Sequence, residues 1–201
     1  MKNKQGFFSI RLGANMDIRV LEQWYEMDKA KNFTEFYAAI KDQRLSMFNI
    51  TYADKHDTIF YVNNGLIPVR NPAPKYNWKS TLPGNTSQTL WTGFRKFNEL
   101  PQYVNPKSGY LFNTNHSSFF ATAPADNLSA DKFPSVDGWE TWHNNRSIRV
   151  VEQMPAAQLD YTTFKQIKFD KQLPATLRYP HNIDTLFLLN ETEYPLYTTL
   201  I

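Results

Sequence analysis

Residues 105–116 read NPKSGYLFNTNH, and the prediction of the fold starts from this stretch. Pro106 and Gly109 indicate that it begins with a tight turn. Alternation over 109–114 then predicts a short strand. Asparagine is disfavoured in strands, so we expect Asn115 to end the strand and offer its side-chain amide in a loop, where sites are usually built. The alternative is that Asn115 only caps the loop by bonding to nearby backbone.

The composition limits the class of protein. A chain of 201 residues can bury one sizeable core, so we expect a single domain over 1–201. The net charge is +3, a small and dispersed surplus that gives little support to nucleic-acid binding. The cysteine count is 0, which excludes disulfides, thiolate metal sites and a cysteine nucleophile. We find no apolar run typical of a membrane span or signal peptide.

Two further parts of the chain are expected to form strands. Residues 47–53 and 58–62 are rich in β-branched and aromatic residues, and the polar segment 54–57 lies between them, which predicts a hairpin. Apolar and polar residues alternate over 7–12, which predicts another strand.

Two helices are expected between the strand over 7–12 and the hairpin. The first has an apolar face that includes Trp24, with Asn15 as its N-cap. The second begins at Asn32, and Glu35 completes a capping box.

Near the carboxyl end, a third helix is predicted from about Asn144 to Met154, where Pro155 stops it. Asp160 caps a fourth helix, and a short last helix is expected near 186–189.

The segment 71–106 contains five prolines and several large aromatic residues. We interpret it as irregular backbone, because its aromatic side chains need burial. A long aromatic-rich loop of this kind usually covers a site.

Several of these segments resemble the β-chain of the penicillin acylases and the related acyl-homoserine lactone acylases. The similarity covers about residues 7–170. The motifs that carry it are Asn-Pro-x-x-Gly-Tyr with Asn-x-Asn at 105–115, Gln-Trp at 23–24 with Lys-Ala-Lys-Asn-Phe at 29–33, Asn-x-x-Tyr-Ala-Asp at 49–54, and Arg-x-x-Arg at 146–149.

The resemblance implies an α+β fold that is part of a four-layer αββα sandwich. It also implies an N-terminal-nucleophile amidohydrolase that cleaves N-acylated small molecules of the penicillin or acyl-homoserine lactone type. In such an enzyme the free α-amine of residue one activates its own side chain, and preorganised donors hold the oxyanion.

The resemblance also assigns roles to individual residues. Asn115 would donate its amide to the oxyanion, and Arg146 would orient the catalytic groups from hydrogen-bond distance while partly buried. Trp24 and Phe48 would line the pocket for the acyl group. Asp126 would bind a structural calcium, and no cofactor is expected for catalysis. The plainer alternatives are core packing for Trp24 and Phe48, a surface salt bridge for Arg146 and a solvated loop for Asp126.

The nucleophile itself is not recognisable in this chain. The chain starts at Met1, its first serine is Ser9, and nothing resembles the family's Gly-Ser-Asn cleavage site. We therefore expect an internal piece of a longer acylase that needs an α-chain and the start of the β-chain as partners, and that is inactive alone. The resemblance implies a periplasmic or secreted protein.

Two other functions remain open from the residues alone. A non-enzymatic sugar- or lipid-binding module would use exposed tryptophans as platforms, and the candidates are Trp78, Trp91, Trp139 and Trp142. A Ser/His hydrolase would use a histidine from the set His56, His116, His143 and His181, but no Gly-x-Ser-x-Gly elbow is present.

Overall fold

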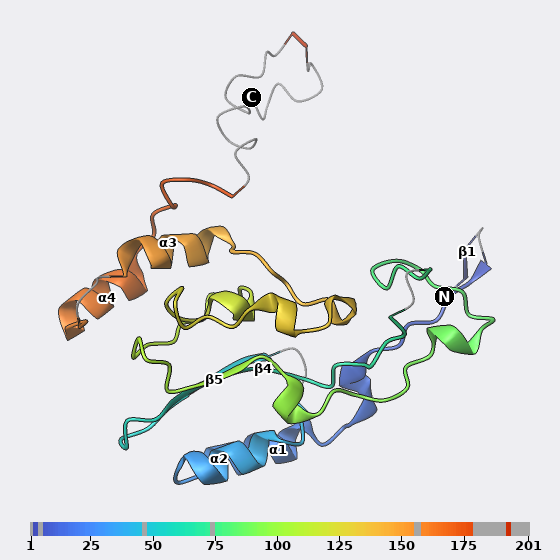
Figure 1. The fold of residues 1–201 in the computed structure, drawn as a ribbon, viewed down its shortest axis with the longest axis horizontal. Helices are drawn as coiled ribbons and strands as arrows, with labels where there is room; N and C mark the ends of the chain where they lie inside the picture. Colours follow the sequence, from blue (N-terminus) through green and yellow to red (C-terminus); the bar gives the residue numbers. More distant parts are fainter. Residues whose placement is uncertain are drawn as a thin grey trace. The chain divides into compact units, whose positions relative to one another are not determined.

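The structure is a computed structural model that describes residues 2–3, 6–45, 48–72, 75–154, 158–178 and 192–193 (Figure 1). The chain forms two compact units, Met1–Trp142 and His143–Ile201, which are described separately. Helices and strands are both present, which confirms the mixed class.

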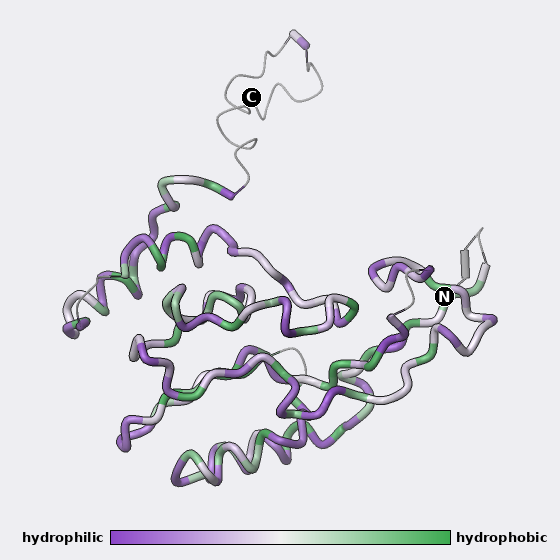
Figure 2. The backbone as a smooth tube through the Cα atoms, in the orientation of Figure 1, coloured by the Kyte–Doolittle hydropathy of each residue, from purple (hydrophilic) through white to green (hydrophobic). Residues whose placement is uncertain are grey.

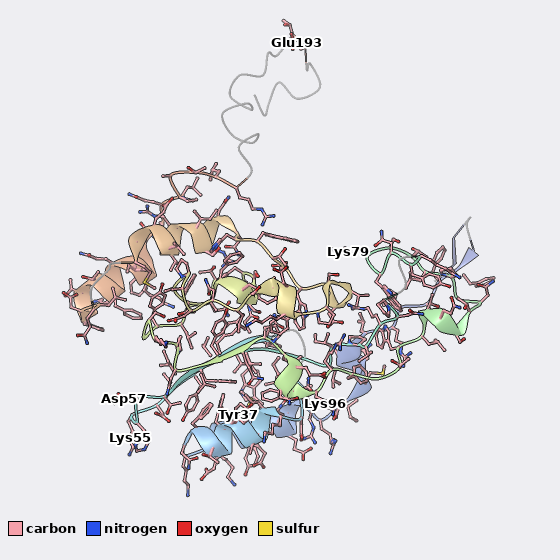
Figure 3. The ribbon with its side chains drawn as sticks, viewed as in Figure 1. Tyr37, Lys55, Asp57, Lys79, Lys96 and Glu193 are labelled. Atoms are coloured by element: carbon pink, nitrogen blue, oxygen red, sulfur yellow. The ribbon has the colours of Figure 1, made fainter. Side chains whose placement is uncertain are left out.

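A three-stranded antiparallel sheet forms the centre of the first unit. It consists of β3 (Phe48–Ala53), β4 (Ile59–Asn64) and β5 (Gln102–Val104), with β4 in the middle. The predicted hairpin is confirmed, since β3 and β4 pair in register from Phe48↔Asn64 to Ala53↔Ile59. Figure 3 shows Lys55 and Asp57 at the turn that joins them.

Helices α1 (Val20–Lys29) and α2 (Phe33–Ile40) cover one face of this sheet (Figure 1). Their packing is aromatic: the ring of Phe36 lies 4.5 Å from that of Tyr52, and Phe33 lies 5.3 Å from Phe60. Tyr37 also bonds across the layer, because its hydroxyl donates to the side chain of Gln102 at 3.0 Å. Residues of all three strands thus anchor α2 on the sheet.

The cap of α2 is confirmed and that of α1 is not. The side chain of Asn32 accepts the backbone N–H of Glu35 at 3.0 Å. The carboxylate of Glu35 accepts from Nδ2 of Asn32 and from the N–H of Lys31, each at 2.9 Å, rather than from the N–H of Asn32 that the predicted capping box requires. Asn15 instead lies in a 3₁₀ turn, Gly13–Met16, and α1 begins after Arg19. Asp17 accepts the backbone N–H of Arg19 at 2.9 Å, so a residue nearer the helix binds this amide.

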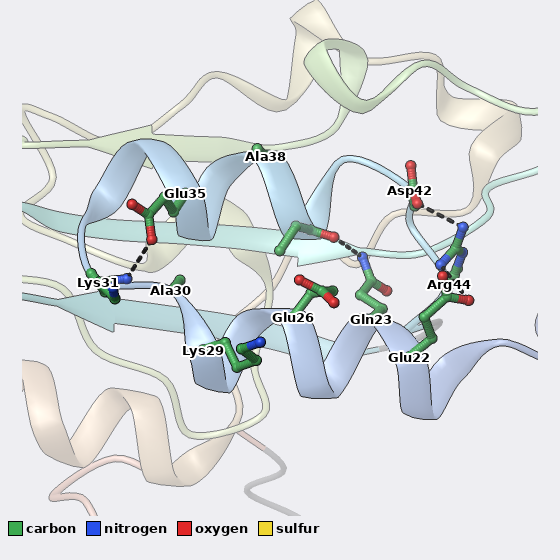
Figure 4. Close-up of a pocket in the computed structure, with 11 residues that line it drawn as sticks. Glu22, Gln23, Glu26, Lys29, Ala30, Lys31, Glu35, Ala38, Asp42 and Arg44 are labelled. Carbon is green, nitrogen blue, oxygen red and sulfur yellow. Dashed lines mark hydrogen bonds and ion pairs between the residues drawn. The ribbon is translucent and has the colours of Figure 1, made fainter.

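A buried amide joins α1 to α2 (Figure 4). Gln23 is 1% exposed, its Nε2 donates to the carbonyl of Ala39 at 2.9 Å, and its Oε1 accepts from the N–H of Leu45 at 2.6 Å. Beside it, Arg44 forms ion pairs with Asp17, Glu22 and Asp42. A buried glutamine with both ends bonded fixes the crossing of the helices.

Irregular chain covers the other face of the sheet. Tyr61, Tyr103 and Ala121 form a second buried cluster there, with Leu111 and Leu128 packed against it. The chain between β5 and the end of the unit contains short 3₁₀ turns, including Ser118–Phe120 and Ser135–Asp137. Figure 2 shows hydrophobic residues distributed through this irregular chain as well as through the helices and strands. Irregular backbone was predicted for 71–106, and β5 is the regular part that the prediction missed.

The strand predicted over 109–114 is wrong. The turn before it is confirmed, because the N–H of Gly109 donates to the carbonyl of Pro106 at 2.9 Å and Gly109 has φ +73°. No residue from 109 to 114 lies in a strand, and β5 takes the edge position beside β4. Asn105, at φ +46°, ends that pairing and turns the chain away from the sheet.

The strand predicted over 7–12 is also wrong apart from its first residue. A two-residue strand, β2 (Gly6–Phe7), pairs with β1 (Lys2–Asn3), and residues 8–12 form no strand. Phe7, Ile10 and Leu12 are exposed. Alternation alone does not make a strand where no neighbouring segment pairs with it.

The second unit contains helices α3 (Asn145–Gln153) and α4 (Tyr161–Phe169). The predicted cap of α4 is confirmed, since Asp160 accepts the N–H of Thr163 at 2.6 Å. The start of α3 is also confirmed, and its cap is Asn144, which accepts the N–H of Ser147 at 2.8 Å. Arg149 on α3 pairs with Asp170, which follows α4, at 2.6 Å. Pro155 and the helix predicted near 186–189 lie outside the described residues.

Candidate active site

Asn115 lies at the turn of a loop rather than at the end of a strand. The loop is closed at its base by a hydrogen bond from the N–H of Phe112 to the carbonyl of Ala121, at 2.9 Å. Asn115 has φ +54°, a left-handed conformation that asparagine tolerates better than most residues. Its N–H donates to Oδ1 of Asn113 at 2.9 Å, so the local backbone cap is supplied by Asn113.

His116 closes the loop from within. The residue is buried, and its ring stacks on Phe112 with the centroids 4.6 Å apart. Because Nδ1 accepts the backbone N–H of Thr114 at 3.1 Å, the ring proton lies on Nε2, which donates to the carbonyl of Phe120 at 2.9 Å. His116 is therefore a structural residue of this loop.

A buried polar network holds the next turn of the loop against the sheet. The hydroxyl of Tyr61 and Nδ2 of Asn63 both donate to Oγ of Ser118 at 3.1 Å. The hydroxyl of Tyr103 donates to the carbonyl of Ser118 at 2.7 Å. Burial raises the pKa of Tyr103 to about 12 and also raises the pKa of Tyr61, so both phenols keep their donor protons near neutral pH.

Asn49 of β3 connects the sheet to the loop at Asn115. Its Nδ2 donates to Oδ1 of Asn113 at 3.1 Å and to the carbonyl of His116 at 3.4 Å. In the sequence, Asn49 belongs to the motif Asn-x-x-Tyr-Ala-Asp at 49–54, which assigns it no role. Its presence inside a strand, where asparagine is disfavoured, is the signal that pointed to a bonding role.

Trp24 and Phe48 lie beside each other. Trp24 projects from α1 and Phe48 begins β3, and their rings meet edge to face at 6.3 Å. Trp24 is 47% exposed and Phe48 is 52% exposed. Neither packs in the buried core, so the plainer interpretation of both as core residues is wrong.

Arg146 is the second residue of α3 and belongs to the second unit. Arg146 is exposed, whereas we expected it to be partly buried. Asn115 belongs to the first unit, so the predicted approach of the guanidinium to the Asn115 amide stays a prediction.

Asp126 caps the turn that precedes the loop. Its Oδ2 accepts the N–H of Ser108 at 2.6 Å. Among the residues that the structure describes, no three His, Asp or Glu side chains are grouped in a way that could hold a metal ion. Ca²⁺ takes six to eight oxygen ligands, so a calcium role for Asp126 stays a prediction.

A serine does lie beside a histidine, but not in a form that suits catalysis. Oγ of Ser147 is 2.9 Å from Nδ1 of His143. Ser147 is 0% exposed, and its Oγ also donates to the carbonyl of Asn144 while accepting that residue's N–H. This hydroxyl is therefore part of the helix cap. His181 lies outside the described residues.

The four tryptophans proposed as platforms do not share one environment. Trp78 donates its Nε1–H to the carbonyl of Asn71 at 2.9 Å, and the guanidinium of Arg11 lies 4.5 Å over the ring of Trp91. Trp139 packs against the buried apolar cluster that includes Phe36 of α2 and Phe60 of β4, and Trp142 is exposed. This arrangement does not favour a sugar- or lipid-binding surface built from all four.

Within the described residues, no helix has both the length and the apolar character that crossing a membrane requires.

Comparison with known proteins places these features in a family. The model of the penicillin amidase family matches residues 2–193, most of the chain. Penicillin G acylase of Escherichia coli is 30% identical over 150 residues, which cover 72% of this chain and 16% of that protein.

A solved structure of thermostable penicillin G acylase from Alcaligenes faecalis is 27% identical, with a TM-score of 0.49, and the match covers 70% of this chain and 22% of that one. The chain thus spans about a sixth, 16%, of the length of the curated relative it matches. On the match of the family model over residues 2–193, the chain belongs to the penicillin amidase family.

Proposed function

We propose that the chain supplies the oxyanion-binding part of an amidohydrolase that cleaves N-acylated small molecules of the penicillin or acyl-homoserine lactone type. The observation that carries the proposal is the loop at Asn115. Its backbone is held at φ +54° by the bond to Asn113, and this loop is anchored to a rigid sheet. A backbone fixed in this way limits the directions that the side-chain amide of Asn115 can take, which suits a preorganised neutral donor.

In the proposed reaction, a serine at a processed amino terminus attacks the amide carbonyl, while its own α-amine takes the hydroxyl proton. The C–N bond then breaks, the amine product leaves with that proton, and water hydrolyses the resulting acyl-enzyme. This nucleophile is supplied from outside the present chain. The carbonyl oxygen gains negative charge in the transition state, and the N–H of the Asn115 side chain stabilises it there. A donor that is already in place needs no rearrangement as the charge develops.

The pair of Trp24 and Phe48 is proposed to bind the acyl group. The two rings present apolar surface from α1 and β3 at an edge-to-face contact of 6.3 Å. Apolar surface that the protein leaves exposed is suited to bury an apolar acyl chain.

Arg146 is proposed to orient the catalytic groups in the complete acylase. Arginine suits this role because its planar fork holds several partners at once. We further propose, from family membership, an α-chain and the first part of a β-chain as partners and a periplasmic or secreted location. A calcium role for Asp126 stays a prediction that needs ligands beyond the described residues.

The proposal is tested in the complete acylase that contains this chain, with the variant Asn115→Gly. Glycine keeps the positive φ and removes the amide, so the loop stays unstrained. We expect kcat to fall by ~10²–10³-fold, as for loss of one oxyanion donor, with KM little changed.

The matched control is Asn85→Ala, which truncates another exposed asparagine. An unchanged kcat in Asn115→Gly, equal to that of the control, would refute the oxyanion role of Asn115.

A further inference from the structure

The amide of Asn49 bonds to the loop on both sides of Asn115. Its Nδ2 donates to Oδ1 of Asn113, two residues before Asn115, and to the carbonyl of His116, the residue after it. We propose that Asn49 is a positioning residue, which fixes the donor geometry of Asn115. This inference rests on the proposed oxyanion role of Asn115.

The side chain of Asn49 is linked to the backbone of Asn115 through a shared acceptor, Oδ1 of Asn113. Oδ1 of Asn113 accepts from Asn49 at 3.1 Å and from the backbone N–H of Asn115 at 2.9 Å. The backbone of Asn115 is in a left-handed conformation, which costs free energy and persists only where the surroundings determine it. Asn49 is the group that ties this conformation to the sheet.

The position of Asn49 in the sheet makes it a firm support. It lies in β3 opposite Asn63 of the central strand, and Asn63 itself bonds to Ser118, further along the same loop. Sites supported by strands hold their geometry better than sites supported by loops alone. Two neighbouring asparagines in one sheet thus bond to two parts of the loop.

The chemistry requires an amide at position 49. Both partners of Nδ2 are carbonyl oxygens, which only accept hydrogen bonds. Aspartate has the same shape but no N–H donor, so Asn49→Asp places a carboxylate oxygen against these acceptors. Leucine has nearly the same size and removes the donors without adding charge. The control is Thr51→Val, on the same face of β3, because in the described part of the chain the Thr51 side chain makes no hydrogen bond.

The first measurement is amide hydrogen exchange by NMR on the full 201-residue chain. In Asn49→Leu we expect the N–H of Asn115 to exchange about five- to tenfold faster, as loss of one neutral hydrogen bond implies. Exchange within the β3–β4 pair should match that of Thr51→Val, which separates a loosened loop from a damaged sheet.

The second measurement is steady-state kinetics in the complete acylase. We expect Asn49→Asp to lower kcat by about tenfold, with KM changed by less than about twofold, because only the transition-state contact is disturbed. Thr51→Val should retain wild-type kcat.

The outcomes distinguish a failure of this inference from a failure of the proposed function. Faster exchange at Asn115 without a loss of kcat makes Asn49 a structural anchor and overturns the proposal, as does wild-type behaviour in both measurements. If Asn115→Gly leaves kcat unchanged, the proposed function fails instead, and the positioning of a catalytic group by Asn49 fails with it. A loss in Asn115→Gly but not in Asn49→Asp overturns this inference alone.

Discussion

At the scale of single residues, Trp24 and Phe48 are large aromatic side chains that the fold leaves about half exposed, at 47% and 52%. Truncating such a ring removes few contacts within the fold, so it destabilises the chain little. If an acyl group covers the ring, the truncation weakens substrate binding instead. A substitution that weakens binding without destabilising the fold therefore distinguishes a residue that lines an acyl pocket from a residue of the core.

In the complete acylase, Trp24→Ala should therefore weaken bulky apolar acyl substrates more than small ones. The expected difference in kcat/KM corresponds to roughly 1.5–3 kcal/mol, the burial of one large side chain. The control is Tyr25→Ala, the adjacent and similarly exposed aromatic of α1. Equal losses for bulky and small acyl groups would mean a folding defect rather than a lost pocket wall.

At the scale of elements, the cap of α2 is the clearest case of local sequence determining structure. Asn32 accepts the N–H of Glu35, whereas Asn15, the other predicted cap, is not at the start of α1. Asn32→Ala should lower the free energy of unfolding by ~1 kcal/mol. Asn15→Ala should change it by less than about 0.5 kcal/mol, as a surface substitution does. Urea titration of both variants measures this, and equal effects would contradict the cap assignment.

The ion pair between α3 and the end of α4 predicts a pH dependence. The hydrogen bond from Arg149 lowers the pKa of Asp170 below its ordinary value of 3.8. A carboxyl whose folded pKa is lowered stabilises the fold above its unfolded pKa, and this stability is lost as pH falls through the folded value. Thermal unfolding followed below pH 4 should thus show a loss that Asp170→Asn lacks. The same acid sensitivity in that variant would exclude Asp170 as its source.

Local patterns predicted the elements whose bonds are local. The caps at Asn32 and Asp160 and the β3–β4 hairpin each depend on residues close in sequence, and all are confirmed. Alternation failed over 109–114 because the backbone there bonds to its own loop, for example from Phe112 to Ala121. A pattern of period two does not reveal whether a partner strand exists.

At the scale of the whole molecule, the features that the sequence did not reveal are contacts between distant residues. Three-residue β5 pairs with β4 across about forty positions, from Phe60↔Val104 to Val62↔Gln102. Gln23 and Asn49 also act across elements, so their roles appear only when the fold is known. Family resemblance assigned roles to Asn115, Trp24 and Phe48, which stay predictions. The structure adds the loop that holds the backbone of Asn115 and the contact between the rings of Trp24 and Phe48.

The αββα sandwich and the meeting of Asn115 with Arg146 stay predictions. Within the first unit, helices cover one face of a sheet and irregular chain covers the other. A crystal structure of the complete acylase should place the guanidinium of Arg146 within hydrogen-bond distance of the Asn115 side chain, directly or through one water. An Arg146 that faces solvent there, away from Asn115, would remove it from the site.

The central claim is that Asn115 binds the oxyanion of the transition state, and the most direct measurement compares two ligands of the complete acylase. One is a tetrahedral phosphonate analogue, and the other is the uncharged substrate amide bound to a nucleophile-deficient form. In Asn115→Gly we predict that the analogue loses ~10²–10³-fold in affinity, while the amide loses less than about threefold. Equal losses for both ligands, or none for the analogue, would contradict the account.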